Sequence, residues 1–71
     1  MRYLVVVEEG PASFGAYVPD LPGCVAAASS REELIGLIQE AIEFHLEGLK
    51  RDGLAIPSPA SSAELVEVTL A

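Results

Sequence analysis

The first quarter of the chain has the hydrophobic pattern of a β-hairpin. Residues Arg2 to Glu8 are rich in β-branched and aromatic side chains and apolar on both faces, which is typical of a strand in the middle of a sheet. A turn at Glu9 to Ala12 follows, and residues Ser13 to Val18 alternate as in a second strand. The two segments therefore predict a hairpin.

A turn with two prolines leads to a third predicted strand. In the segment Pro19 to Gly23, the prolines fix φ and lack an amide donor, and the glycine accepts positive φ. The sequence predicts a sharp turn here. Small side chains from Cys24 to Ala28 then predict a short strand.

The clearest local signal is the start of a helix. Ser30 and Glu33 have the spacing of a capping box, with the serine as the N-cap. Apolar residues then recur every three or four positions, and Gly53 stands where the helix is expected to end. The pattern predicts an amphipathic helix of about five to six turns. Its expected core-facing stripe comprises Leu34, Leu37, Ile38, Ala41, His45 and Leu49, widened by Ile35, Ile42 and Leu46.

A fourth strand is predicted after a loop at Ile56 to Ala63, because residues Glu64 to Leu70 again alternate. The helix returns the chain to the far end of the sheet, so we expect this strand to run parallel to the first strand and beside it. The predicted fold class is α+β, with the order β-β-β-α-β and a four-stranded sheet of strand order 3-2-1-4. One helix covers one face, so the other face or an edge is expected to bind a partner or another copy.

Length and charge narrow the possible partners. The chain has 71 residues, which predicts a single domain over residues 1–71, and so small a domain gains from forming a dimer or tetramer. Eleven acidic residues against four basic ones give a net charge of −7, which argues against direct nucleic-acid binding. A basic protein partner fits better, although the charge can also serve only to keep the domain soluble.

The cysteine content and the absence of a leader predict a cytoplasmic protein. Cys24 is the single cysteine and cannot form an intramolecular disulfide, and no secretory leader opens the chain. The apolar run from Tyr3 to Val7 is far shorter than the roughly 20 residues that a membrane helix needs. We therefore expect no membrane association.

Catalytic chemistry finds little support in the sequence. His45 has no serine or cysteine nucleophile at a recognisable spacing, and Cys24 has no second cysteine with which to complete a metal site. Metal-dependent chemistry would need converging carboxylates, which the expected strand geometry does not favour. We predict no enzyme activity, no metal and no cofactor. The carboxylates considered are Glu8, Glu9, Asp20, Glu64 and Glu67.

Candidate partner-binding residues lie in and near the proline turn. The turn either only connects two strands or displays Asp20 and Leu21 to a partner with little loss of entropy. The aromatic residues Tyr3, Phe14 and Tyr17 fit either an interface or the core. The predicted partner-binding set is Pro19, Asp20, Leu21, Glu8 and Glu9.

Three segments together resemble the HicB family of antitoxins. They are Gly15 to Cys24 with its Val-Pro-Asp-Leu-Pro-Gly-Cys run, the capping segment Ser30 to Leu34, and Ile56 to Pro59 after Gly53. The resemblance covers nearly the whole chain. It implies a partly degraded ribonuclease-H-like fold that binds and masks HicA, a small basic RNA-cleaving toxin, in a type II toxin-antitoxin system.

The sequence departs from the HicB pattern in one respect. HicB-like antitoxins often carry a C-terminal DNA-binding domain, whereas this chain ends at Ala71, directly after the expected fourth strand. We therefore expect a toxin-binding domain without direct DNA binding. The alternative is a stand-alone oligomeric domain, an orphan HicB-like protein that binds another protein or a small ligand.

Overall fold

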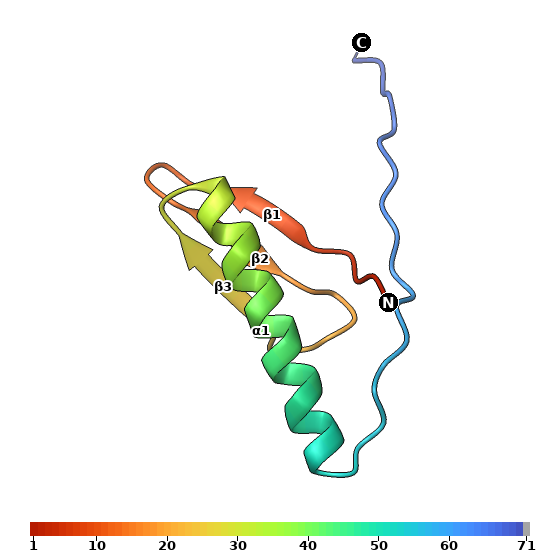
Figure 1. Cartoon of the computed structure of the whole chain (residues 1–71). Coiled ribbons are helices and arrows are strands. Elements are labelled where there is room, and N and C mark those ends of the chain that lie inside the picture. Colours follow the sequence, from red (N-terminus) through yellow and green to blue (C-terminus); the bar gives the residue numbers. More distant parts are fainter. Residues whose placement is uncertain (71) are drawn as a thin grey trace.

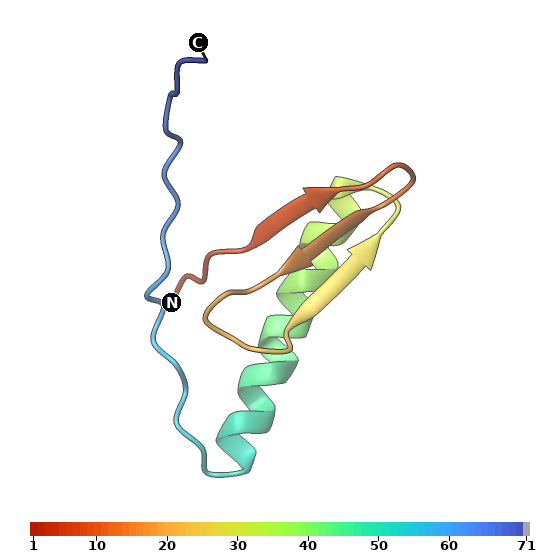
Figure 2. The same cartoon turned by 180° about the vertical axis from the view of Figure 1, so that it is seen from behind.

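The structure is a computed structural model that describes residues 1–70, and it contains three strands followed by one long helix (Figure 1). The strands are β1 (Val6–Glu9), β2 (Phe14–Tyr17) and β3 (Val25–Ala28), and the helix is α1 (Arg31–Arg51). The strands form one antiparallel sheet of order β1-β2-β3. The helix lies across one face of this sheet, and Figure 2 shows the opposite face from behind.

The predicted sharp turn between the second and third strands is present and closes on itself. The Val18 amide donates to the Cys24 carbonyl at 3.2 Å, and the Cys24 amide donates to the Leu21 carbonyl at 3.0 Å. Gly23 has a φ of 84°, a conformation that favours glycine. The turn therefore directs the Leu21 side chain into the core, where it is fully buried.

Both ends of α1 match the signals in the sequence. The Ser30 side chain accepts a hydrogen bond from the Glu33 amide at 3.2 Å, which confirms Ser30 as the N-cap and forms one of the two bonds of the predicted capping box. At the other end, Gly53 has a φ of 71°, and its amide donates to the Lys50 carbonyl. The Leu54 amide donates to the Leu49 carbonyl at 2.9 Å, which completes a Schellman motif.

The core lies between the helix and one face of the sheet. Small side chains on that face, such as Ala16 and Ala26, allow the helix to approach closely, and Leu34 and Ile38 are the helix residues that are buried. Burying one such side chain contributes about 1.5 to 3 kcal/mol. The buried core comprises Ala16, Val18, Leu21, Cys24, Leu34 and Ile38.

The predicted helix stripe is too wide. Ile35 is 45% exposed and Leu37 is 39% exposed, so neither lies in the core as expected. The sheet beneath the helix has only three short strands and covers a narrow strip of the helix surface. A helical period identifies the apolar side of a helix, but the width of the neighbouring sheet decides how much of that side is buried.

The predicted four-stranded sheet of order 3-2-1-4 is wrong. No strand follows α1 in the described part of the chain, and residues 62–70 run away from the sheet as an extended, exposed segment (Figure 1). β1 is consequently an edge strand, whereas the sequence predicted a central one. Hydrogen bonds with the side chains of Tyr3 and Asp20, which lie far from this segment in the sequence, hold residues 57–61 and fix where the segment leaves the domain.

Candidate partner-binding surface

The sheet face opposite the helix carries an uncovered row of apolar side chains, which we call the open face row. Val6 of β1 lies opposite Tyr17 of β2, and Tyr17 lies opposite Val25 of β3. Tyr17 is 42% exposed and Val25 is 64% exposed. Because side chains alternate between the faces of a sheet, this row points away from the helix, whereas the neighbouring row with Ala16 points into the core.

The sheet surface beside the open face row is flat, and it has an acidic side chain at one end. The next row on this face runs from Glu8 through Gly15 to Ala27, so two of its three positions have little or no side chain. Glu8 is exposed. A flat apolar surface that contains an aromatic residue and ends in a carboxylate is typical of protein–protein interfaces with an apolar centre and a polar rim. Figure 2 shows no element over this face among the residues drawn in colour.

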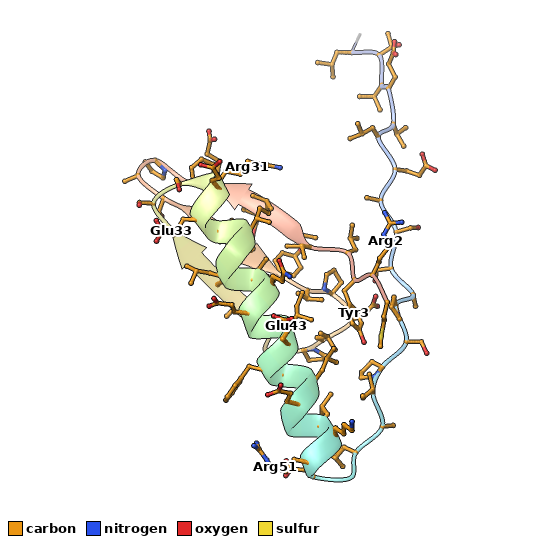
Figure 3. All side chains as sticks on the ribbon, viewed as in Figure 1. Arg2, Tyr3, Arg31, Glu33, Glu43 and Arg51 are labelled. Atoms are coloured by element: carbon orange, nitrogen blue, oxygen red, sulfur yellow. The ribbon has the colours of Figure 1, made fainter. Side chains whose placement is uncertain are left out.

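Asp20 holds the segment that follows the helix. One carboxylate oxygen of Asp20 accepts hydrogen bonds from the amides of Ala60 and Ser61, both at 2.9 Å. The other oxygen accepts from the Ser61 hydroxyl at 2.8 Å. We call this arrangement the Asp20 clamp. Close by in the fold, the Tyr3 hydroxyl donates to the Pro57 carbonyl, and Figure 3 shows Tyr3 beside the passing segment.

The Asp20 clamp favours the ionised form of its carboxyl group. The Ser61 amide, then the Ala60 amide and then the Ser61 hydroxyl lower the pKa of Asp20 below its ordinary value, and they outweigh a small opposing effect of burial. A carboxyl group with a lowered folded-state pKa stabilises the structure above its ordinary pKa of about 3.9. That contribution is lost as the pH falls through the lowered pKa.

We expect Asp20→Asn to release residues 57–61 at neutral pH while the sheet and helix stay folded. The amide side chain keeps one acceptor oxygen and loses the charge, so it cannot accept all three hydrogen bonds. In the unmodified chain, the NMR shifts of the Ala60 and Ser61 amides should change only when the pH drops below about 4. In Asp20→Asn they should be displaced already and titrate little.

Ser62→Ala is the matched control for this change, because Ser62 is exposed and directly follows the clamp. In Ser62→Ala, the NMR shifts of the amides of residues 60 and 61 should still change at acidic pH as in the unmodified chain. Identical acid transitions in Asp20→Asn and the unmodified chain would show that the clamp does not hold the segment in solution.

The predicted site residues lie in different environments. Pro19 is exposed and Glu8 lies on the open face, whereas Glu9 points to the opposite face of the sheet. The Leu21 side chain is fully buried, and the Asp20 carboxylate is occupied by the clamp. Leu21 and Asp20 therefore shape and tether the turn, and a role for any of the five in partner binding stays a prediction.

The sequence reasoning did not single out Val6 and Val25, and it left Tyr17 open between core and interface. Tyr17 lies on the open face, while Tyr3 and Phe14 pack against the core. The signal that could have identified Val25 is its parity in the third strand, opposite to the inward-facing Cys24 and Ala26. The contact between Asp20 and Ser61, 41 residues apart, has no local signal in the sequence.

Other chemistry-bearing groups are isolated. Cys24 is buried, and burial raises the pKa of its thiol. Within residues 1–70, no three His, Cys, Asp or Glu side chains gather closely enough to bind a metal ion, and no pocket is present. In the same range, no helix is long and apolar enough to cross a membrane. The predicted absence of catalysis and of a cofactor stays a prediction.

A family model described as "HicB_like antitoxin of bacterial toxin-antitoxin system" matches residues 3–69 of the chain. The chain therefore belongs to the HicB-like antitoxin family. This agrees with the resemblance carried by the proline turn and the helix cap. The match includes all three strands, the helix, the Asp20 clamp and nearly all of the extended segment that follows it.

Several curated proteins are similar to this HicB-like chain. A UPF0150 protein of Helicobacter pylori is 42% identical over 57 residues, covering 80% of this chain and 79% of that protein. Antitoxin HicB 2 of Photorhabdus laumondii is 30% identical over 69 residues, covering 96% of this chain and 50% of that protein. A 14.9 kDa protein of Haemophilus phage HP1 is 35% identical over 57 residues, which cover 43% of its length. The chain thus spans half or less of the last two relatives, and no solved structure matches it.

Proposed function

We propose that this HicB-like chain is an antitoxin that binds and masks a small basic RNA-cleaving toxin of the HicA type. The observation that carries the proposal is the open face row, because Val6, Tyr17 and Val25 form an apolar surface that the domain itself leaves uncovered. An exposed apolar patch with a polar rim is the usual form of a protein-binding site. Membership of an antitoxin family supports a protein toxin as the occupant.

Charge complementarity supports a basic partner. The net charge is −7, and acidic side chains such as Glu40, Glu43 and Glu47 are exposed along the helix, where Figure 3 labels Glu43. A basic toxin would be attracted to such a molecule over a distance of about 10 Å at moderate salt. Charge of this kind mainly raises the rate of association, while the buried apolar contact slows dissociation.

Within the proposed complex, the predicted site residues take different roles. Glu8 lies at the acidic end of the open face and is proposed to pair with a basic side chain of the toxin. Pro19 is exposed and is proposed as a rigid contact at the rim of the interface. Leu21 anchors the turn of Pro19 in the core, and Asp20 links this turn to Ser61. Glu9, on the other face, would contribute through its charge alone.

The test is reconstitution with a small basic HicA-type protein, to be sought as the product of a gene next to the one for this chain. We expect RNA cleavage by that protein to fall to background when the purified antitoxin reaches equimolar amounts. The association rate should fall by about 10-fold or more between low and high salt, with a smaller change in the dissociation rate. Unchanged RNA cleavage in the presence of excess antitoxin would overturn the proposal.

A further inference from the structure

The chain ends, as far as it is described, in an exposed apolar arm, which we define as residues 62–70. Every residue of the arm is exposed, and its β-branched and aliphatic side chains have no cover. The arm stands clear of the sheet and helix in both Figure 1 and Figure 2. Its most exposed apolar residues are Leu65 at 101%, Leu70 at 92%, Val66 at 76% and Val68 at 75%.

The overall dimensions show how little the arm packs against its own domain. The radius of gyration is 14.4 Å, whereas a compact chain of this length has a radius of gyration of roughly 11 Å. The molecule measures 52 × 27 × 17 Å, so it is about twice as long as it is wide. The Asp20 clamp fixes the root of the arm at Ser61 and so directs the arm past the sheet.

The sheet has an edge that matches this arm. β1 pairs with β2 on one side, and within residues 1–70 no strand pairs with its other side. Val5 and Val7 face the helix and pack against the core, yet both stay only half-buried. The core is therefore incomplete at the β1 edge, where one more strand would cover these valines and pair the free backbone groups.

We propose that two copies of this chain exchange arms, each arm adding a strand to the β1 edge of the other copy. The arm has the alternation that such a strand needs: Val66, Val68 and Leu70 share one side, which would lie beside the half-buried Val5 and Val7. Backbone hydrogen bonds of the added strand would supply affinity, and the three apolar side chains would supply register.

A second copy of the chain fits this edge better than an unrelated protein. Each molecule carries both the donor arm and the acceptor edge, so two copies satisfy each other in a closed twofold dimer. The addition occurs at the edge and leaves the open face row free for a toxin. The proposal is consequently independent of the proposed function, and it is tested on the purified chain alone.

The first test is Val68→Pro, measured by sedimentation equilibrium over a range of protein concentrations. We expect the full-length chain to dimerise, and proline at position 68 to weaken the dimer by roughly 100-fold, since it removes an amide donor and fixes φ. Val68→Thr is the matched control, because it keeps the amide and the β-branched shape. It should weaken the dimer by less than about tenfold. The helical circular dichroism signal should be the same in all three proteins, because the arm lies outside the core.

The second test locates the contact. In a Cys24→Ala background, one tagged copy carries Val68→Cys and an untagged copy carries Glu9→Cys, at the exposed end of β1 and on the same face as Val5 and Val7. A short thiol-specific cross-linker should join tagged to untagged chains only when both cysteines are present. A chain that stays monomeric at every concentration, a dimer that survives Val68→Pro unchanged, or the absence of this cross-link would each overturn arm exchange.

Discussion

Leu21→Ala is expected to lower the free energy of unfolding by about 2 to 5 kcal/mol, a large part of the total for a domain of this size. Leu21 is the residue at which the proline turn enters the core, and its side chain is fully buried. The turn around it is fixed by backbone hydrogen bonds and by the positive φ of Gly23, so the neighbouring residues cannot collapse easily into the cavity. The loss of stability should therefore be well above the free energy of transferring the removed methyl groups from the core to water.

Urea unfolding monitored by circular dichroism measures this effect. Leu54→Ala is the matched control, since it removes the same atoms from a side chain that is 58% exposed. Its effect should stay within about 0.5 kcal/mol. Equal effects of the two changes would contradict a core position for Leu21 and would return this residue to the candidates for direct partner contact.

Val25→Arg is expected to weaken binding of the proposed toxin by at least about 2 kcal/mol, or roughly thirtyfold in the dissociation constant. Val25 lies at one end of the open face row and is 64% exposed, so arginine can be accommodated without disturbing the core. In the complex, the new charge would be buried against a basic partner, where it has no counter-ion and is repelled. Unfolding by urea should be nearly unchanged.

Phe44→Arg is the control that distinguishes an effect at the open face from an effect of net charge alone. It makes the same change in net charge at a residue of α1 that is 74% exposed and on a different side of the molecule from the open face. It should slow association slightly and leave dissociation unchanged. If Val25→Arg and Phe44→Arg have the same small effect in a titration of RNA cleavage, the toxin does not bind the open face.

Elements with local signals were predictable from the sequence. The hairpin, the proline turn and both ends of the helix depend on residues within four or five positions of each other, such as Ser30 with Glu33. The family resemblance was carried by these same segments. The uncovered sheet face also followed from the sequence, since a single helix cannot cover both faces of a sheet.

The fourth strand could not be judged from its own pattern. Alternation in Glu64 to Leu70 reports that the segment is suited to an extended conformation with one apolar side, and the structure does hold it extended. The pattern does not state where the pairing partner lies. The position of the segment depends on the Asp20 clamp, which joins residues 20 and 61. No local spacing in the sequence predicts this contact. The same holds for Ile35 and Leu37, whose exposure depends on the width of the sheet.

We expect the contacts of the Asp20 clamp to form late in folding. The sheet and helix form from contacts between neighbouring segments, whereas the contacts of Tyr3 with Pro57 and of Asp20 with Ser61 span 54 and 41 residues. Contacts of long sequence separation carry the larger loop-closure entropy and form late. The strands and the helix, which end at Arg51, can therefore form before Ser61 reaches Asp20. On this account the arm reaches its final position only after the sheet and helix have formed.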